Sequence, residues 1–478
     1  MPTRFQALRL FTLPLWLGVL AVALCAAPAR ATSAGAPQDD VAARAGETTV
    51  SWEELDGLIF VRHANSPEGH EALKHLLKTK LLDQLALESG LVVRDEEVDA
   101  LWRETEESLR QAGQGDLPEL LAQQGMSAAE FREFLRLGVV QRTLARRALG
   151  IPDDQPISGE LQETWLEKVI VERGLVEPPA PWTDGVVLSC GGVTIGVDEY
   201  VTNLRYRIDP AALRQGMEQI LLEKRLRERM PDLAESALDK AVNEELARRR
   251  TNVLADPRYK GIGYDELMKA KGILIDYWPE DPSLRAAALT RLWVERRYSE
   301  EDLRRTYQDE REYFDGHFGE AIETWVLFLR AGVLKNDLVP RTFDEAEREL
   351  FEITRAVRSS ADFEVVVLEH SEAVKSRELR GRVGFVTRLG STLPAILRDE
   401  IFRCVDEGSY APDLDPKDRR RLTHAIRTSE GVALCWLGER TPTPAWDEMI
   451  VHVHAELRAR VQDDSLDTKS VVTYLDTE

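Results

Sequence analysis

The sequence is poor in cysteine, in positive charge and in long apolar runs, and each shortage excludes a class of protein. Four cysteines in 478 residues are too few for a disulfide scaffold, which needs dense cysteine in a short chain. The 62 Lys and Arg residues are outnumbered by 84 Asp and Glu, which leaves a formal net charge of −22. Because nucleic acids and anionic membranes repel acidic proteins, we expect neither as a partner.

A long apolar run occurs at the N-terminus and nowhere later in the sequence. Arg4 and Arg9 lead into LFTLPLWLGVLAVALCAA, and ARA supplies a small-x-small cleavage site after Ala31. This pattern predicts a secretory signal peptide at residues 1–31. We therefore expect an exported, periplasmic protein that meets the membrane only through this segment. A retained membrane anchor and a lipoprotein attached at Cys25 are the alternatives.

Three cysteines remain after cleavage, and they do not define a framework. Cys404 and Cys435 fall in the same predicted domain and could form a disulfide in an oxidising compartment, while Cys190 has no such neighbour. Their apolar surroundings fit buried free thiols equally well.

Histidine is also scarce, with 8 residues, and its spacing does not favour a metal site. His452 and His454 are two apart, which places them on different faces of a helix. His70 and His75 are not accompanied by cysteine or clustered acids. We expect no metal site and no cofactor.

One structural unit is used twice in the first two thirds of the chain. ARAGETTVSWEEL (residues 43–55) matches LSCGGVTIGVDEY (188–200), and each predicts a short hairpin followed by a helix start. Ser51 and Glu54 have the spacing of a capping box. A repeat of this kind predicts one supersecondary unit per copy.

The match continues into amphipathic helices at residues 76–91 and 220–233, which place Lys80 opposite Lys224. A proline-rich linker lies between the copies. We therefore predict two mainly helical modules, residues 41–175 and residues 184–320. Aromatic residues in these modules, among them Trp165, Tyr200 and Trp278, either line a cradle for a ligand or form the core.

The periodicity changes after residue 320. Apolar strands alternate with amphipathic helices in the order β-α-(α)-β-α-β-β, which predicts a small α+β domain at residues 321–440. Residues 441–478 predict a C-terminal helix and tail. The fold class is thus α+β, with two helical modules before a compact mixed domain.

Three motifs of the mixed domain carry a family resemblance. DFEVVVLEHS (residues 362–371) precedes GRVGF (381–385) and LPAILRDEIF (393–402). In this order and spacing, residues 321–440 resemble the parvulin family of peptidyl-prolyl isomerases. With a signal peptide and helical modules, the whole chain resembles exported chaperones of the SurA, PrsA and PpiD type. The resemblance implies unfolded or nascent exported polypeptides as partners.

The resemblance also indicates where catalytic residues should be. The family's polar positions fall on Trp325, Ala373 and Ala433. Alanine neither donates a hydrogen bond nor titrates, and tryptophan offers a single N–H. His370 and Glu372 lie nearby in sequence and are possible substitutes. We expect weak or absent isomerase activity.

The apolar half of the family site is retained in type. The resemblance implies a binding groove for proline or aromatic side chains lined by Phe385, Leu393, Leu397 and Phe402 together with Trp325. The sequence thus predicts a periplasmic folding chaperone with a degenerate isomerase domain. The alternatives are an active isomerase with an atypical site and an interaction scaffold of an envelope assembly.

Overall fold

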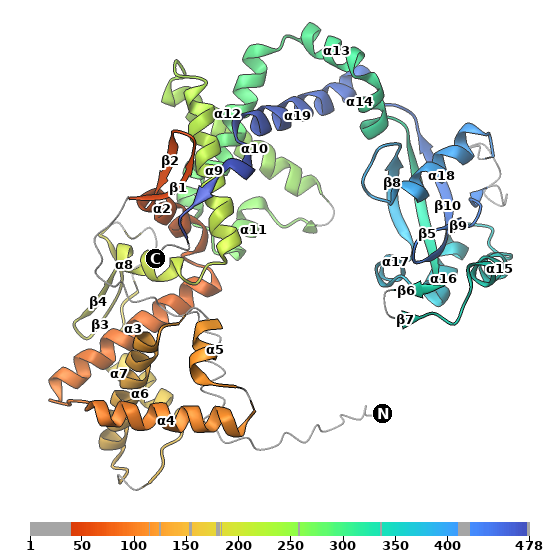
Figure 1. Cartoon of the computed structure of the whole chain (residues 1–478). Helices are drawn as coiled ribbons and strands as arrows, with labels where there is room; N and C mark the ends of the chain where they lie inside the picture. Colours follow the sequence, from red (N-terminus) through yellow and green to blue (C-terminus); the bar gives the residue numbers. More distant parts are fainter. Residues whose placement is uncertain are drawn as a thin grey trace. The chain divides into compact units, whose positions relative to one another are not determined.

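The computed structural model describes residues 40–475 apart from residues 114, 124–125, 153–154, 178–181, 183, 257–258, 335–336 and 410–420. The predicted signal peptide lies outside these residues. The chain folds as two compact units, residues 40–292 with 462–475 (unit 1) and residues 293–461 (unit 2) (Figure 1). Both combine helices with small antiparallel sheets, which confirms the α+β class. Among the described residues, none of the helices combines the length and apolar character that a membrane span requires.

Unit 1 contains both copies of the repeat. The first copy consists of β1 (Val41–Ala45), β2 (Thr48–Ser51), α2 (Trp52–His63), α3 (Pro67–Glu88), α4 (Asp95–Gln111), α5 (Leu117–Gln123), α6 (Ala128–Leu149) and α7 (Gly159–Glu172). The second consists of β3 (Val186–Cys190), β4 (Val193–Gly196), α8 (Val197–Arg205), α9 (Pro210–Glu228), α10 (Glu235–Ala255), α11 (Tyr264–Ala270), the 3₁₀ turn η2 (Ile275–Glu280) and α12 (Pro282–Arg297).

Local sequence sets the helix ends of the first copy. The Ser51 hydroxyl accepts from the backbone N–H of Glu54, whose carboxylate accepts from the Ser51 N–H, so the predicted capping box is present. Ser127 and Glu130 make the same pair at the start of α6. α6 ends at Gly150, whose φ of 65° is a left-handed conformation that glycine adopts without strain.

The two copies are joined by an exchange of helices. α9 of the second copy packs against β1 and β2, while α3 of the first copy packs against β4. α2 and α8, which follow the two hairpins, pack against each other. Each hairpin is thus covered by a helix of the other copy (Figure 1).

Matched lysines make matched bonds across this exchange. Lys80 of α3 donates to the Glu199 carboxylate at 2.6 Å, and Lys224 of α9 donates to that of Glu54 at 2.7 Å. Each lysine also donates to a backbone carbonyl of the other copy's hairpin: Lys80 to that of Thr194 and Lys224 to that of Thr49. Partly exposed ion pairs contribute only about 0.2–1 kcal/mol each, so these bonds select the packing register more than they stabilise it.

Each hairpin also pairs with a segment from another part of the chain. β11 (Val472–Thr473), which follows α19 (Trp446–Ser465) and the turn η4 (Thr468–Ser470), pairs with β1. Val176, at the end of the first copy, forms an isolated bridge with Ser189 of β3. The first hairpin therefore gains a third strand from the C-terminal segment, and the second gains a single bridge from the end of the first copy.

An apolar core shared by both copies lies around the two hairpins, while α4, α5 and α6 of the first copy enclose a smaller cluster of their own. Leu55 and Leu81 of the first copy lie in the same buried cluster as Ile195 and Leu221 of the second. The sequence divides this region into separate modules, whereas in the structure each hairpin completes its burial with the other copy. Residues 293–320, which the sequence assigns to the second module, lie in unit 2.

The aromatic residues named from the sequence are part of the core. Trp165, Tyr200 and Trp278 are 8%, 1% and 7% exposed. Tyr200 donates a hydrogen bond to the Ala64 carbonyl at 2.6 Å, which satisfies its hydroxyl in the interior. These rings stabilise unit 1 and do not line a cradle.

Unit 2 contains the small α+β domain that the sequence predicts, with a helix pair before it and one helix after it. Its elements are α13 (Glu300–Asp309), α14 (Arg311–Phe318), β5 (Ala321–Arg330), β6 (Val333–Leu334), β7 (Asp337–Leu338), α15 (Phe343–Ile353), α16 (Ser360–His370), α17 (Val374–Glu378), β8 (Arg382–Thr387), α18 (Ala395–Asp406), β9 (Ile426–Arg427), β10 (Gly431–Thr441) and most of α19. This order contains the predicted β-α-(α)-β-α-β-β succession and adds the short β6–β7 hairpin and α17, which the sequence does not predict.

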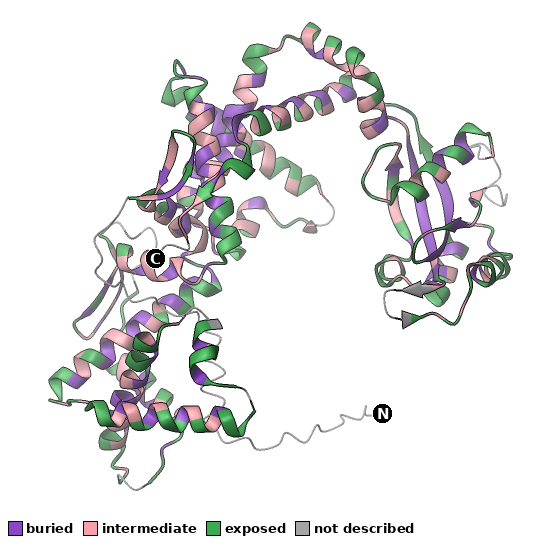
Figure 2. Ribbon diagram, viewed as in Figure 1, coloured by how far each residue is buried: buried purple, intermediate pink, exposed green. Residues whose placement is uncertain are grey.

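The domain is built on a four-stranded antiparallel sheet of order β8-β5-β10-β9. β5 and β10 are central and mostly buried, as Figure 2 shows. Because successive side chains of a strand point to opposite faces, the sheet has two apolar faces. α15 and α16 cover one of them, and α18 covers the other.

Candidate functional site

The α18 face of the sheet unites part of the predicted groove. Leu397 and Phe402 of α18 lie in one buried cluster with Ala433 of β10. Leu393, just before α18, is partly buried against the same cluster. Leu397 and Phe402 are 5% and 4% exposed, so they form the layer beneath any groove while Leu393 lies nearer its surface.

Trp325 lies on the other face. Its ring belongs to the cluster under α15 and α16, and its Nε1 donates to the Glu364 carboxylate at 3.2 Å. The side chain is 5% exposed. The structure therefore does not bring Trp325 together with Leu397, Phe402 or Ala433. On β5, Val326 and Phe328 face α18 instead.

Phe385 lies on the edge strand β8 and is 49% exposed. Its neighbour Val386 is fully buried in the α18-face cluster. Leu389, in the turn after β8, and Ile396 of α18 are exposed to similar extents. Accessible apolar surface on this domain therefore exists around β8 and the start of α18.

The residues considered as polar substitutes are placed at the end of α16 and just after it. The Glu372 carboxylate accepts from the backbone N–H of Arg330 at 2.6 Å and from the Arg341 guanidinium at 3.0 Å. It therefore holds the end of β5 in place. His370 is exposed near the end of α16, and Ala373 is the N-cap of α17.

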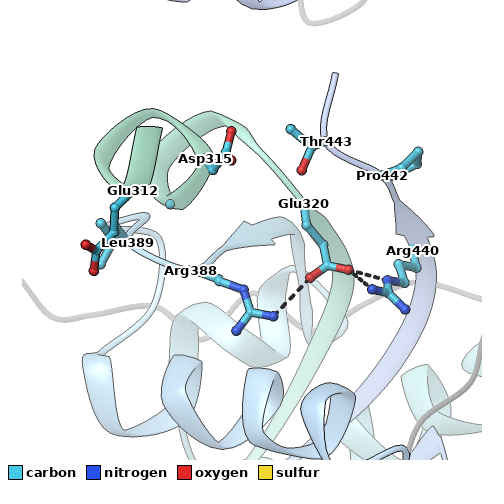
Figure 3. A pocket seen from close by; sticks show the side chains of 9 residues that line it. Glu312, Asp315, Glu320, Arg388, Leu389, Arg440, Pro442 and Thr443 are labelled. Carbon is cyan, nitrogen blue, oxygen red and sulfur yellow. Dashed lines mark hydrogen bonds and ion pairs between the residues drawn. The ribbon is translucent and has the colours of Figure 1, made fainter. Parts of the chain in front are cut away.

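A charged cleft of about 610 Å³ lies where α14 leads into β5 (Figure 3). Glu320 is its central group and forms ion pairs with both Arg388 and Arg440. Arg388 also pairs with Asp406 at 2.7 Å and lies 4.6 Å above the Phe402 ring. Since these arginines are already neutralised by carboxylates, the cleft ties strands to helices and is a poor anion site.

Unit 1 has a cavity of different character. It has a volume of about 250 Å³ and lies among α3, α4, α6 and α7. Its apolar lining consists of Leu82, Leu101, Phe134, Leu135, Leu137 and Ile157. Phe134 is 37% exposed and stacks on Phe131 with ring centroids 5.9 Å apart. Gly138 contributes a side-chain-free position to the wall.

Polar groups occupy one side of this cavity. Lys78 pairs with the Glu163 carboxylate at 2.6 Å, and Gln141 donates to the same carboxylate at 3.2 Å. Burial, helped by the cations of Arg207 and Lys78, lowers the pKa of His75 to about 4. The imidazole is therefore neutral at neutral pH. The cavity is mainly apolar, and Lys78, Gln141 and Glu163 on its polar side are bonded to one another.

Sequence reasoning did not find this cavity. Its walls come from four helices distributed over residues 75–163, and their apolar residues show only the periodicity of ordinary amphipathic helices. A glycine inside α6 is the one local signal, because glycine costs about 1 kcal/mol in a helix interior relative to alanine.

Solved structures of PrsA foldases and SurA-like chaperones are similar to this chain. The peptidylprolyl isomerase PrsA from Bacillus anthracis is 10% identical with a TM-score of 0.27, and the match covers 52% of this chain and 94% of that chain. For PrsA from Bacillus subtilis the identity is 15%, the TM-score 0.20 and the coverage 61% and 90%. For a SurA-like chaperone of Campylobacter jejuni they are 14%, 0.23, 50% and 84%. No family model and no curated protein matches the chain.

Proposed function

We propose that this chain is an exported folding chaperone that binds unfolded polypeptides and holds one large apolar side chain of the client in the unit 1 cavity. The observation that carries the proposal is the cavity itself, which is apolar and partly open at Phe134. Its volume of about 250 Å³ lies below the ~300–1,000 Å³ typical of small-molecule sites. It fits a side chain better than a cofactor. The signal peptide predicted at residues 1–31 supports export to the periplasm.

Filling the cavity tests this role. Gly138 lies in the interior of α6, and a Cβ at this position meets no atom within 4 Å. Gly138→Leu is therefore expected to fold normally while occupying the cavity. Burial of one large side chain contributes about 1.5–3 kcal/mol, so affinity for an unfolded model protein should fall by about tenfold or more. Aggregation suppression, followed by light scattering on residues 32–478, measures the effect.

A matched control is Ala129→Leu, which adds a leucine to the same helix away from the cavity. Ala129 is exposed near the start of α6 and does not line the cavity, so this variant should protect the client as the wild type does. Equal protection by Gly138→Leu and Ala129→Leu would place client binding elsewhere. If the wild-type chain does not suppress aggregation of the client, the chaperone proposal is wrong and a scaffold of an envelope assembly is favoured.

The parvulin-like domain contributes binding surface and little catalysis in this proposal. Rotation about the amide bond has a barrier of ~18–20 kcal/mol, and each strong preorganised donor typically contributes 10²–10³ in rate. The family positions Trp325, Ala373 and Ala433 do not supply such donors on the α18 face. The exposed apolar groups near Phe385 remain available to a proline or aromatic side chain.

We expect the rate of cis–trans isomerisation of an Ala-Pro peptide, measured with a coupled protease, to stay within about tenfold of the uncatalysed rate, since the donors that lower the barrier are missing. Replacing His370 or Glu372 should leave this rate unchanged. The alternative, an active isomerase with an atypical site, requires a rate well above background that falls in His370→Ala or Glu372→Gln.

A further inference from the structure

A cluster of potential metal ligands lies at the C-terminal part of α18 and is used by none of the sites above. Glu400 and Cys404 are one turn apart on α18, and His424 comes from the segment that leads into β9. The Glu400 Oε1 atom lies 3.4 Å from His424 Nδ1 and 3.8 Å from Cys404 Sγ. One ligand atom from each of the three residues falls within 4.8 Å of the other two.

These spacings match the edges of a zinc tetrahedron. Zinc binds imidazole nitrogen at about 2.0–2.1 Å, carboxylate oxygen at about 2.0–2.2 Å and thiolate sulfur at about 2.3 Å. At a tetrahedral angle, those bond lengths place neighbouring N and O atoms about 3.4 Å apart and neighbouring O and S atoms about 3.6 Å apart. The two measured edges, 3.4 Å and 3.8 Å, are therefore near their bound values before any ion enters.

We propose that Glu400, Cys404 and His424 form a zinc site with the fourth position open to water. The donor set of one sulfur, one nitrogen and one oxygen suits the borderline-soft Zn²⁺ better than Mg²⁺ or Ca²⁺, which prefer oxygen alone. The His424 side chain is 72% exposed, so an ion and its water can reach the cluster. This inference does not depend on the proposed chaperone function.

Charge and burial in the cluster agree with such a site. The Cys404 thiolate and the Glu400 carboxylate together neutralise a divalent cation. Cys404 is 3% exposed, and zinc binds cysteine as the thiolate, so the ion replaces the proton of a buried sulfur.

Arg403 occupies part of the site in the metal-free state. Its guanidinium pairs with Glu400 at 2.5 Å and lies 3.3 Å from His424 Nδ1. It also pairs with Glu407 at 2.9 Å, and its side chain is 45% exposed. The guanidinium can therefore keep Glu407 as its partner while the ion takes its place beside Glu400 and His424.

Bound zinc would tie α18 to the lead-in of β9 beside the α18 face of the sheet. Cys404 belongs to the same buried cluster as Leu397 and Phe402. The sequence predicts no metal site because Cys404 and His424 are 20 positions apart and Glu400 looks like an ordinary helix-surface acid. Only the packing of β9 beside α18 brings the three together.

Cobalt substitution tests the site directly. Residues 32–478 without a tag, reduced and treated with chelator, are titrated with Co²⁺, and the thiolate-to-cobalt charge-transfer band is followed by absorbance. We expect one equivalent to produce the band of a single thiolate and Zn²⁺ to abolish it. Cys404→Ser should remove the band, and His424→Gln should weaken binding by about tenfold or more, as loss of a zinc ligand or of its orienting partner does.

Two further variants keep the test independent of folding. Arg403→Gln removes the competing cation and should tighten binding severalfold, which a damaged protein would not do. Cys190→Ser replaces a buried free thiol in unit 1 and should leave the titration unchanged. Absence of the band in the wild type, or a band that survives Cys404→Ser and disappears in Cys435→Ser, would overturn the assignment.

Discussion

Residues 41–175, expressed alone, are expected to remain largely unfolded, although the sequence marks them as a module. Their hairpin is covered by α9 and paired with β11, both outside the fragment. Leu55 and Leu81 are fully buried in a cluster that includes Ile195 and Leu221 of the second copy. Each large apolar side chain left exposed forfeits about 1.5–3 kcal/mol, and a few such losses equal the whole stability of a domain. Circular dichroism on heating should show no cooperative transition.

The matched control retains both copies. Residues 41–292 joined to 462–475 by a short Gly/Ser linker contain all of unit 1 that the structure describes except residue 40. Gln462 donates to the Thr290 hydroxyl at 3.4 Å, so the ends to be joined already lie close together. This chain should unfold cooperatively. Cooperative unfolding of residues 41–175 by themselves would contradict the shared-core arrangement.

Gly69→Ala is expected to destabilise unit 1 by about 1–3 kcal/mol, the range of core overpacking. A Cβ at Gly69 would lie 2.4 Å from the His63 carbonyl oxygen and 2.6 Å from the Tyr200 hydroxyl. The first contact is with backbone, and the second is with a hydroxyl held by its bond to Ala64. Neither atom can move without opening the corner between α2 and α3. The midpoint of urea unfolding at constant slope measures the change.

Gly57→Ala is the control for this prediction. It makes the same replacement inside a neighbouring helix, where the new Cβ meets nothing within 4 Å. Alanine is favoured over glycine in a helix interior by about 0.5–1 kcal/mol, so this variant should be slightly more stable than the wild type. If the Gly69→Ala chain is as stable as the wild type, the junction between α2 and α3 is less tightly packed than in the structure.

Local signals in the sequence were sufficient to predict most helices and strands. The capping box at Ser51 and Glu54 and the apolar run of β5 involve neighbours a few positions apart. The repeat also predicted both hairpins and the correspondence of Lys80 with Lys224. Such features depend on short-range hydrogen bonds and periodicity, which a sequence displays directly.

The candidate site was predictable only in part. The motif order indicated α18, and Leu393, Leu397 and Phe402 lie in or against one buried cluster on its face of the sheet. It could not assign the face of Trp325, because a shift of one residue on a strand moves a side chain to the other side of the sheet. Trp325 instead packs beneath α15 and α16 and bonds Glu364.

By itself, the sequence determined an α+β chain with a duplicated hairpin-and-helix unit followed by a small mixed domain, because caps, turns and apolar periods act over a few residues. The tertiary structure alone decided which helix covers which hairpin, where an apolar cavity remains among α3, α4, α6 and α7, and that Glu400, Cys404 and His424 meet. Those outcomes depend on contacts between residues far apart in the chain. These contacts are stabilised by burial of apolar surface against a distant segment of the same chain, which the local sequence does not specify.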